Sequence, residues 1–216
     1  STAIRAALGL VERTGGTVVD GDTDVSTLQP RERAKLMSYV PQGAPVHWPL
    51  TAERTVALGR VPHLNPWQDL SAKDETAIET AMRSTDCWEF RDRLVTTLSG
   101  GERSRVLLAR TLAVGAGYIL ADEPTASLDP MHQLQVMDIL RSEAASGTGV
   151  LVVMHDLAHA MRYCDKIVLL NGGKLLAAGT APDVLTDDNL KTAFGVEVAR
   201  WTDGGVHYLV PQRVVG

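Results

Sequence analysis

The chain has 216 residues, of which 44% are hydrophobic and 22% charged, and its formal net charge is −5. This composition is typical of a globular domain and excludes disorder over the whole chain, and the acidic balance argues against a nucleic-acid surface, which is usually basic. Cys87 and Cys164 lack the spacing of a redox motif or zinc site and suit a reducing compartment, and no apolar run approaches the roughly 20 residues that span a bilayer.

The chain begins with a predicted helix, because apolar residues in STAIRAALGL recur at helical spacing and Ser1 and Thr2 suit a helix N-terminus. The next segment, GGTVVDGDTDV, mixes β-branched residues with Gly and Asp turn signals and predicts short strands. KLMSYVPQG then predicts a strand that ends at Pro41.

A proline-rich stretch from Pro45 to Pro66 surrounds one helical candidate, AERTVALGRV, and residues 71–92 also read as helical. In LSGGERSRVLLARTLA, Ser99 and Glu102 form a capping box at the start of an amphipathic helix. Gly100 and Gly101 are poor helix formers in its first turn and would let an anion approach the backbone N–H groups. The alternative is a well-capped helix without a ligand. We predict a mostly helical subdomain over residues 44–112.

The second half predicts a parallel sheet. GYILAD and GVLVVM read as strands buried on both faces, and the segment between them has helical periodicity. Asp122 and Glu123 follow the first of these strands, at the sheet edge where ligands bind, although two solvated acids would fit the same pattern. KIVLL-NGG-KLLAAG predicts a hairpin with its turn at Asn171-Gly172, and a weak helix and a weak strand, VHYLV, follow.

Five motifs in order across residues 42–155 resemble those of the ATP-binding subunits of ATP-binding cassette (ABC) transporters. LSGGE resembles the family signature, YILAD with Glu123 the Walker B strand and its catalytic glutamate, and SLD, ending at Asp129, the D-loop. Gln42 in YVPQG matches the Q-loop glutamine, and His155 matches the switch histidine. Ser104 and Met154 are modest departures that leave the resemblance intact.

The resemblance implies an α/β fold: a P-loop NTPase-like parallel-sheet core with an antiparallel β subdomain and an inserted helical subdomain. We expect one ABC ATPase domain over 1–216, with 1–43 and 113–216 as the RecA-like core with the β subdomain and 44–112 as the helical subdomain that carries the signature. The family's phosphate loop, with its Walker A glycines and lysine, would end just before Ser1, so we expect the fold to be N-terminally incomplete. This chain alone is then expected to fold poorly and not to hydrolyse ATP.

The resemblance also implies ATP and Mg²⁺ as cofactors. It assigns catalysis to Glu123, which would polarise the attacking water, with His155 and Gln42. Mg²⁺ would be held by Ser1, Gln42 and Asp122. The residues implied in nucleotide binding are Ser1, Thr2, Ser99, Gly100, Gly101, Glu102 and Asp129. Of these, Ser99, Gly100 and Gly101 would bind the γ-phosphate of ATP held by a second subunit, and Asp129 would lie at the same dimer seam. The remaining histidines match no functional position and are interpreted as structural: His47, His63, His132, His159 and His207.

The implied partners are a second cassette in a homodimer, integral-membrane permease subunits and, indirectly, a substrate-binding protein, with no nucleic acid. The location implied is the cytoplasmic face of the membrane. We expect the permease to dock on an apolar surface formed by Pro45, Val46, Trp48, Pro49 and Leu50. The alternative is that these residues pack within the helical subdomain. The sequence of residues 30–195 resembles the sequences of importers of iron–siderophore, haem or cobalamin type. The alternatives are a non-catalytic cassette that acts as scaffold or regulator, and a soluble ABC ATPase of repair or translation.

Overall fold

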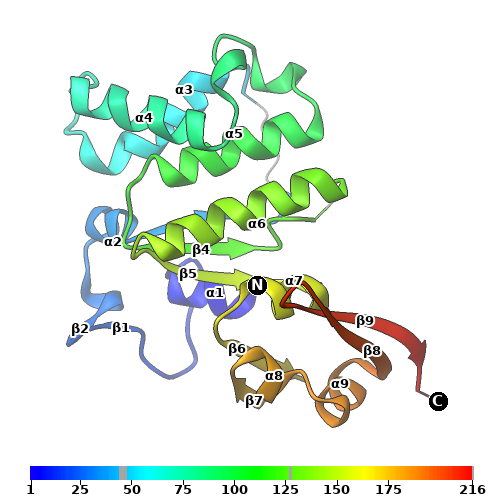
Figure 1. Ribbon diagram of the computed structural model, residues 1–216. Helices are drawn as coiled ribbons and strands as arrows, with labels where there is room; N and C mark the ends of the chain where they lie inside the picture. Colours follow the sequence, from blue (N-terminus) through cyan, green and yellow to red (C-terminus); the bar gives the residue numbers. More distant parts are fainter. Residues whose placement is uncertain (44–47, 127, 216) are drawn as a thin grey trace. The chain divides into compact units, whose positions relative to one another are not determined.

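The computed structural model describes residues 1–43, 48–126 and 128–215 (Figure 1). By compactness the chain divides into two units, Ser1–Val153 and Met154–Gly216. This division does not test the subdomain boundaries proposed from the sequence at 43/44 and 112/113, which stay a prediction. None of the described helices combines the length and the apolar character needed to cross a bilayer.

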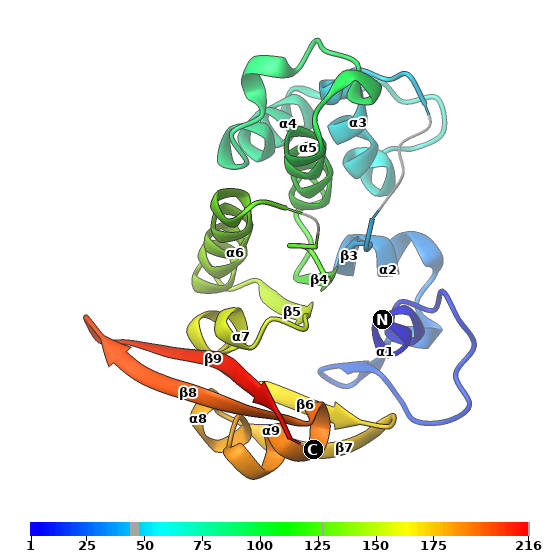
Figure 2. The same ribbon diagram turned by 90° about the vertical axis from the view of Figure 1, so that its right-hand side faces the viewer.

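A three-stranded parallel sheet lies at the centre of the first unit. Its order is β3 (Met37–Val40), β4 (Tyr118–Asp122), β5 (Gly149–Val153), and α6 (Pro130–Ala145) connects β4 to β5. This confirms the predicted parallel β–α–β unit. Figures 1 and 2 show α6 on one face of the sheet and α1 (Thr2–Ala7) on the other. Ile4 and Leu8 on and after α1 pack with Met37 and Leu120 of the sheet.

The two strands expected to be buried on both faces differ. In β4 every residue from Ile119 to Asp122 is buried, as predicted. In β5 no residue is fully buried and Leu151 is 52% exposed, so the prediction was wrong there. The physical reason is position: among the described strands β4 has a neighbour on each side, whereas β5 pairs only with β4 and lies at the sheet edge.

Before the sheet, the chain forms short elements. β1 (Val19–Asp20) and β2 (Thr23–Asp24) make a two-residue antiparallel pair around Gly21, followed by the 3₁₀ turn Val25–Thr27. Helix α2 (Pro30–Leu36), which begins with proline at its first position, leads directly into β3. The predicted opening helix and early strands are therefore present, and the strands are very short.

The segment between β3 and β4 is helical where it is described. It contains α3 (Ala52–Ala57), the 3₁₀ segment η2 (Leu58–His63), α4 (Ala72–Ser84), two 3₁₀ turns (Trp88–Phe90 and Val95–Thr97) and α5 (Gly100–Leu112). Side chains of α3, α4 and α5, including Val56, Met82 and Val106, share one apolar core. The predicted helix over 52–61 becomes 3₁₀ after Ala57. At Gly59 a Cβ would lie 2.2 Å from the Arg110 carbonyl oxygen, so only glycine allows η2 to approach α5 this closely.

The second unit has its own core around Ala160, Leu185, Leu190 and Leu209. It comprises α7 (Leu157–Tyr163), the hairpin β6 (Ile167–Asn171)–β7 (Lys174–Gly179), α8 (Ala181–Val184), α9 (Asp187–Phe194), and the hairpin β8 (Val196–Asp203)–β9 (Val206–Val214).

Two predictions for the second unit need correction. The turn of the first hairpin is Gly172-Gly173, because Asn171 pairs with Lys174 and both glycines have positive φ. Strand β8 was not predicted, because its polar residues interrupt the alternation of apolar and polar positions that is typical of a strand. Its Trp201 stacks on Tyr208, which lies across the hairpin and not nearby in sequence.

Candidate functional site

The site starts at the carboxyl end of β4, where an apolar strand delivers a carboxylate into the interior. Asp122 is fully buried. The Ser1 hydroxyl donates to its Oδ1 at 2.8 Å, and the Tyr39 hydroxyl donates to its Oδ2 at 3.2 Å. The Ser1 amino nitrogen also lies 3.7 Å from Oδ1. The N-cap of α1 and the end of β3 therefore meet at this carboxylate, as the parallel topology requires.

Glu123 is held in an unusual backbone conformation immediately after the strand. Its φ is +49°, in the left-handed region that non-glycine residues rarely adopt. Its N–H donates to the Val153 carbonyl at 2.9 Å, and its own carbonyl accepts from the Ala126 N–H at 3.1 Å. Strain of this kind persists only where neighbours impose it, and it is common at functional sites. The backbone thus leaves the extended conformation at Glu123, immediately after the strand.

The Gln42 side chain contacts this glutamate. Gln42 follows β3, the neighbour of β4, and its Nε2 donates to Glu123 Oε2 at 2.7 Å. Four residues that the sequence suggested, Ser1, Gln42, Asp122 and Glu123, thus lie at one edge of the sheet. Tyr39 belongs with them and was missed, because a tyrosine in an apolar strand signals packing unless the position of Asp122 is known.

The donor chemistry at this edge suits magnesium. Among the described residues, no three His, Cys, Asp or Glu side chains cluster in a way that could hold a metal ion by themselves. The oxygens at this edge include the Ser1 hydroxyl, the Asp122 carboxylate and the Gln42 amide, beside the Glu123 carboxylate and the Tyr39 hydroxyl. Mg²⁺ in nucleotide sites takes one or two protein oxygens and completes its shell with phosphate and water, so the residues fit.

The N-terminus of α5 is a second candidate position. The Ser99 hydroxyl accepts from the Glu102 N–H at 3.3 Å, and Glu102 Oε2 accepts from the Ser99 N–H at 2.8 Å, which confirms the capping box. The Ser99 N–H is the main cause of a lowered pKa for Glu102, whose Oε1 also accepts from Arg93 at 2.9 Å. A Cβ at Gly100 would meet no atom within 4 Å, so packing inside the chain does not require glycine there.

Asp129 caps the next helix, α6. Its Oδ1 accepts from the His132 N–H at 3.0 Å, and its Oδ2 lies 2.6 Å from His132 Nδ1. These bonds, the backbone one first, lower the pKa of Asp129. Ser127, in the same predicted loop, lies outside the described residues.

The remaining predicted site residues are Thr2 and His155. Thr2 is exposed in the first turn of α1. His155 is exposed and belongs to the second unit, so the structure does not place it relative to Glu123.

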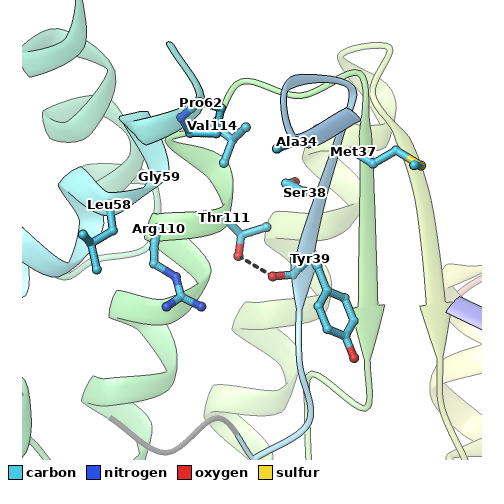
Figure 3. A pocket seen from close by; sticks show the side chains of 10 residues that line it. All are labelled: Ala34, Met37, Ser38, Tyr39, Leu58, Gly59, Pro62, Arg110, Thr111 and Val114. Carbon is cyan, nitrogen blue, oxygen red and sulfur yellow. Dashed lines mark hydrogen bonds between the residues drawn. The ribbon is translucent and has the colours of Figure 1, made fainter. Parts of the chain in front are cut away.

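A cavity of about 200 Å³ lies between the end of α2, β3, η2 and α5 (Figure 3). Thr111 Oγ1 donates to the Tyr39 carbonyl at 3.4 Å across it, and burial lowers the pKa of Arg110, which lines it. Of the expected docking residues, Trp48 is 74% exposed, Pro49 is exposed and Leu50 is half-buried. Pro45 and Val46 lie outside the described residues.

Comparison with known proteins identifies the family of the chain. The sequence profile of the ABC transporter family matches residues 1–126. The hemin import ATP-binding protein HmuV of Rhodococcus jostii is 41% identical over 217 residues, covering 99% of this chain and 73% of that protein. The cobalamin import ATP-binding protein BtuD of Halobacterium salinarum is 41% identical over 204 residues, 94% of this chain and 51% of that protein. The chain thus spans about half the length of BtuD.

Among solved structures, a dimeric ATP-binding cassette in a post-hydrolysis state, bound to ADP and Pi, has a TM-score of 0.70 at 26% identity. The match covers 83% of this chain and 79% of that chain. The predicted fold class, a parallel-sheet core with antiparallel strands and an inserted helical segment, is thereby confirmed. The sequence profile, the relatives and the geometry at the tip of β4 lead to the same conclusion: the chain belongs to the ABC transporter family.

Proposed function

We propose that this chain is part of an ATP-hydrolysing subunit that powers a membrane importer. The observation that carries the proposal is the hydrogen-bonded set Ser1–Asp122 and Gln42–Glu123 at the carboxyl edge of the parallel sheet. Adjacent acids with different partners suit phosphoryl transfer, in which one group holds a metal ion and another orients water. The names of HmuV and BtuD, both import ATP-binding proteins, support the same role.

The residues act as follows in this proposal. Ser1, Asp122 and Gln42 would hold Mg²⁺, which neutralises developing charge on the phosphate oxygens of ATP. Glu123 accepts a hydrogen bond from the attacking water and orients it. Gln42, which already contacts Glu123, adjusts the position of that carboxylate when nucleotide binds. His155 would donate a hydrogen bond to the γ-phosphate.

A second copy of the cassette completes the site. The first turn of α5 offers the Ser99 hydroxyl and the N–H groups of Gly100 and Gly101, which suit the γ-phosphate of ATP held by the partner copy. Glu102 fixes the cap of this turn, and Asp129 would lie at the dimer seam. The structural relative in a dimeric state with ADP and Pi supports this arrangement. ATP then joins two copies, and hydrolysis releases them, because affinity differs between the closed and open states.

Glu123→Gln tests this mechanism in the full-length protein. The substitution keeps size and backbone but removes the negative charge that orients water, so we expect ATP turnover to fall by about 100-fold or more. ATP-dependent dimers should persist and should be visible by size-exclusion chromatography with light scattering. As a control, Glu89→Gln in the helical segment should leave turnover unchanged. Full turnover by the Glu123→Gln protein would refute the assignment.

We also propose that the surface after Gln42 docks a permease. Trp48 and Pro49 are exposed apolar residues close in sequence to Gln42, and exposed aromatic residues are enriched in the centres of interfaces. Trp48→Ala should weaken co-purification with the permease by about tenfold while ATP affinity stays unchanged. Trp67→Ala, at a fully exposed tryptophan outside the predicted contact, is the matched control. Equal loss of permease and ATP binding would indicate a packing role instead.

For cargo, the relatives named for hemin and cobalamin import favour an iron-chelate, haem or cobalamin type of molecule. The subunit would then work at the cytoplasmic face of the membrane, with a permease and, indirectly, a substrate-binding protein. The cargo itself is selected by those partners, so the proposal is made for the class.

A further inference from the structure

We propose that His132 is a positioning residue. It keeps the first turn of α5, which begins with Gly100 and Gly101, at a fixed position relative to Asp129. The inference rests on the proposed function, because it concerns the two elements assigned above to the ATP held between two cassettes. From the sequence His132 was interpreted as a structural histidine. The structure places it between the N-terminus of α6 and the N-terminus of α5.

The imidazole of His132 is locked from one side by Asp129. One carboxylate oxygen accepts from the His132 backbone N–H and the other meets the ring Nδ1 at 2.6 Å. Because these bonds lower the pKa of Asp129, the carboxylate is ionised near neutral pH and acts as the acceptor. Nδ1 therefore carries the hydrogen, and the ring atoms Cε1, Nε2 and Cδ2 are left for other contacts.

These three ring atoms lie against Gly101. A Cβ at Gly101 would lie 3.3 Å from both Cε1 and Nε2 of His132 and 3.4 Å from Cδ2. The His132 side chain is only 19% exposed. Gly100, one residue earlier, has open space where a Cβ would be. The two glycines of the signature therefore differ: Gly100 leaves room for a ligand, and Gly101 leaves room for the histidine ring.

The contact connects the starts of two helices, at Gly101 and at Asp129, which are 28 positions apart in sequence: Asp129 holds the ring of His132, and the ring lies beside Gly101. A movement of the Asp129 carboxylate at the dimer seam must turn the imidazole and shift the N–H groups of the first turn of α5. The positioning role follows, because a well-packed side chain in contact with both Asp129 and Gly101 has little freedom to absorb such a movement.

The chain contains a matched control for this arrangement. Asp156 caps α7 and accepts from the His159 N–H at 2.8 Å, with His159 Nδ1 3.4 Å from the second carboxylate oxygen. The backbone cap of the Asp-x-x-His pattern is thus repeated. No atom of His159, however, is among the nearest neighbours of any glycine whose surroundings are described. The Nδ1 of His159 is buried without a hydrogen-bond partner, so a difference between the two histidine variants reports the two ring contacts of His132 together, with Asp129 and with Gly101, and not the loss of a histidine near a helix start.

The experiment uses the full-length protein with Glu123→Gln, and it measures the ATP concentration that gives half-maximal dimerisation. Adding His132→Ala should raise this concentration by about tenfold, whereas adding His159→Ala should change it by less than about twofold. His132→Gln, which retains an amide to meet Asp129, should give an intermediate shift. In protein with Glu123 intact, His132→Ala should raise the KM for ATP more than it lowers kcat.

A double substitution tests the contact itself. Gly101→Ala places a methyl group 3.3 Å from the ring, which must give by a few tenths of an ångström. The contact is therefore already altered in that background, and His132→Ala should add less than about twofold. Multiplicative effects of Gly101→Ala and His132→Ala would overturn the inference, and so would an unchanged ATP requirement in the His132 variants. Failure of the Glu123→Gln protein itself to dimerise would instead contradict the proposed function. If His132→Ala also lowers the thermal unfolding midpoint, the His132→Gln protein is used instead. A raised ATP concentration for half-maximal dimerisation then supports the inference, and an unchanged one overturns it.

Discussion

Two buried aspartates in the first unit are satisfied in different ways. Asp74 in α4 receives a charged donor that is part of the fold, Arg60 Nε at 2.8 Å, together with the Ser71 hydroxyl at 2.5 Å and the Ser71 N–H at 3.0 Å. Asp122 at the tip of β4 receives the hydroxyl groups of Ser1 and Tyr39. The first carboxylate accepts a hydrogen bond from a guanidinium, whereas the second accepts from two hydroxyl groups and has the Ser1 amino nitrogen 3.7 Å away.

The difference separates a carboxylate that is paired within the fold from one to which the proposed function assigns a cation. Arg60 also donates to the carbonyls of Ala113 and Val114, so one buried ion pair ties η2, α4 and the end of α5 together. The hydrogen bonds from Ser71 are the main cause that lowers the pKa of Asp74 to about 2, with Arg60 contributing. A carboxylate with hydroxyl partners next to a second acid is instead suited to bind a cation from outside the chain.

Breaking the Arg60–Asp74 pair should have the largest effect on stability. Arg60→Ala removes the charged donor of the buried Asp74 carboxylate, which keeps its Ser71 donors, and takes the guanidinium from two carbonyl groups; removing one partner of a buried pair typically costs about 3–5 kcal/mol. Urea denaturation of the full-length protein measures this loss. As a control, Lys35→Ala removes a partly exposed pair with Glu32 at 3.0 Å and should cost less than about 1 kcal/mol. Similar costs for the two variants would remove the basis of the comparison.

Lowering the pH should weaken the same pair more gradually. Because the pKa of Asp74 is lower in the folded protein, about 2 against 3.8, its contribution to stability is present above pH 4 and is lost as the pH falls from about 4 towards 2. Asp74→Asn should remove this dependence, so the difference in unfolding free energy between the two proteins should shrink over that range. A difference that stays constant from pH 5 to pH 2.5 would contradict the assignment.

Asp122→Asn should have the smallest effect on the free energy of unfolding, and it should selectively weaken nucleotide binding. Asparagine keeps an oxygen for the Ser1 hydroxyl, and the Tyr39 hydroxyl can turn to accept from the new amide, so we expect a change in unfolding free energy within about 1 kcal/mol. The charge that would hold Mg²⁺ is lost, so Mg²⁺-dependent affinity for ATP should fall by about tenfold. A titration with and without Mg²⁺ measures this. A large loss of stability would instead show that Asp122, like Asp74, stabilises the fold.

Much of the fold could be predicted from local patterns. Period and turn signals gave the opening helix, the strands at Met37–Val40 and Tyr118–Asp122, the capping box of Ser99 and Glu102, and the hairpin after Lys166. Strand β8 could not be predicted, because its support comes from residues across the hairpin such as Tyr208. The exposure of Leu151 in β5 depends on how many neighbours the strand has, which an apolar run does not encode.

The sequence by itself determined the order of the motifs and the local shapes that carry them, because strands, caps and tight turns depend on residues a few positions apart. The tertiary structure alone decided which distant groups meet: Tyr39 at Asp122, Arg60 at Asp74, and the ring of His132 on Gly101. These contacts join residues 14 to 83 positions apart and arise from the packing of whole elements. A histidine three residues after a predicted loop is therefore interpreted as structural in the sequence, and only the fold gives it a specific neighbour.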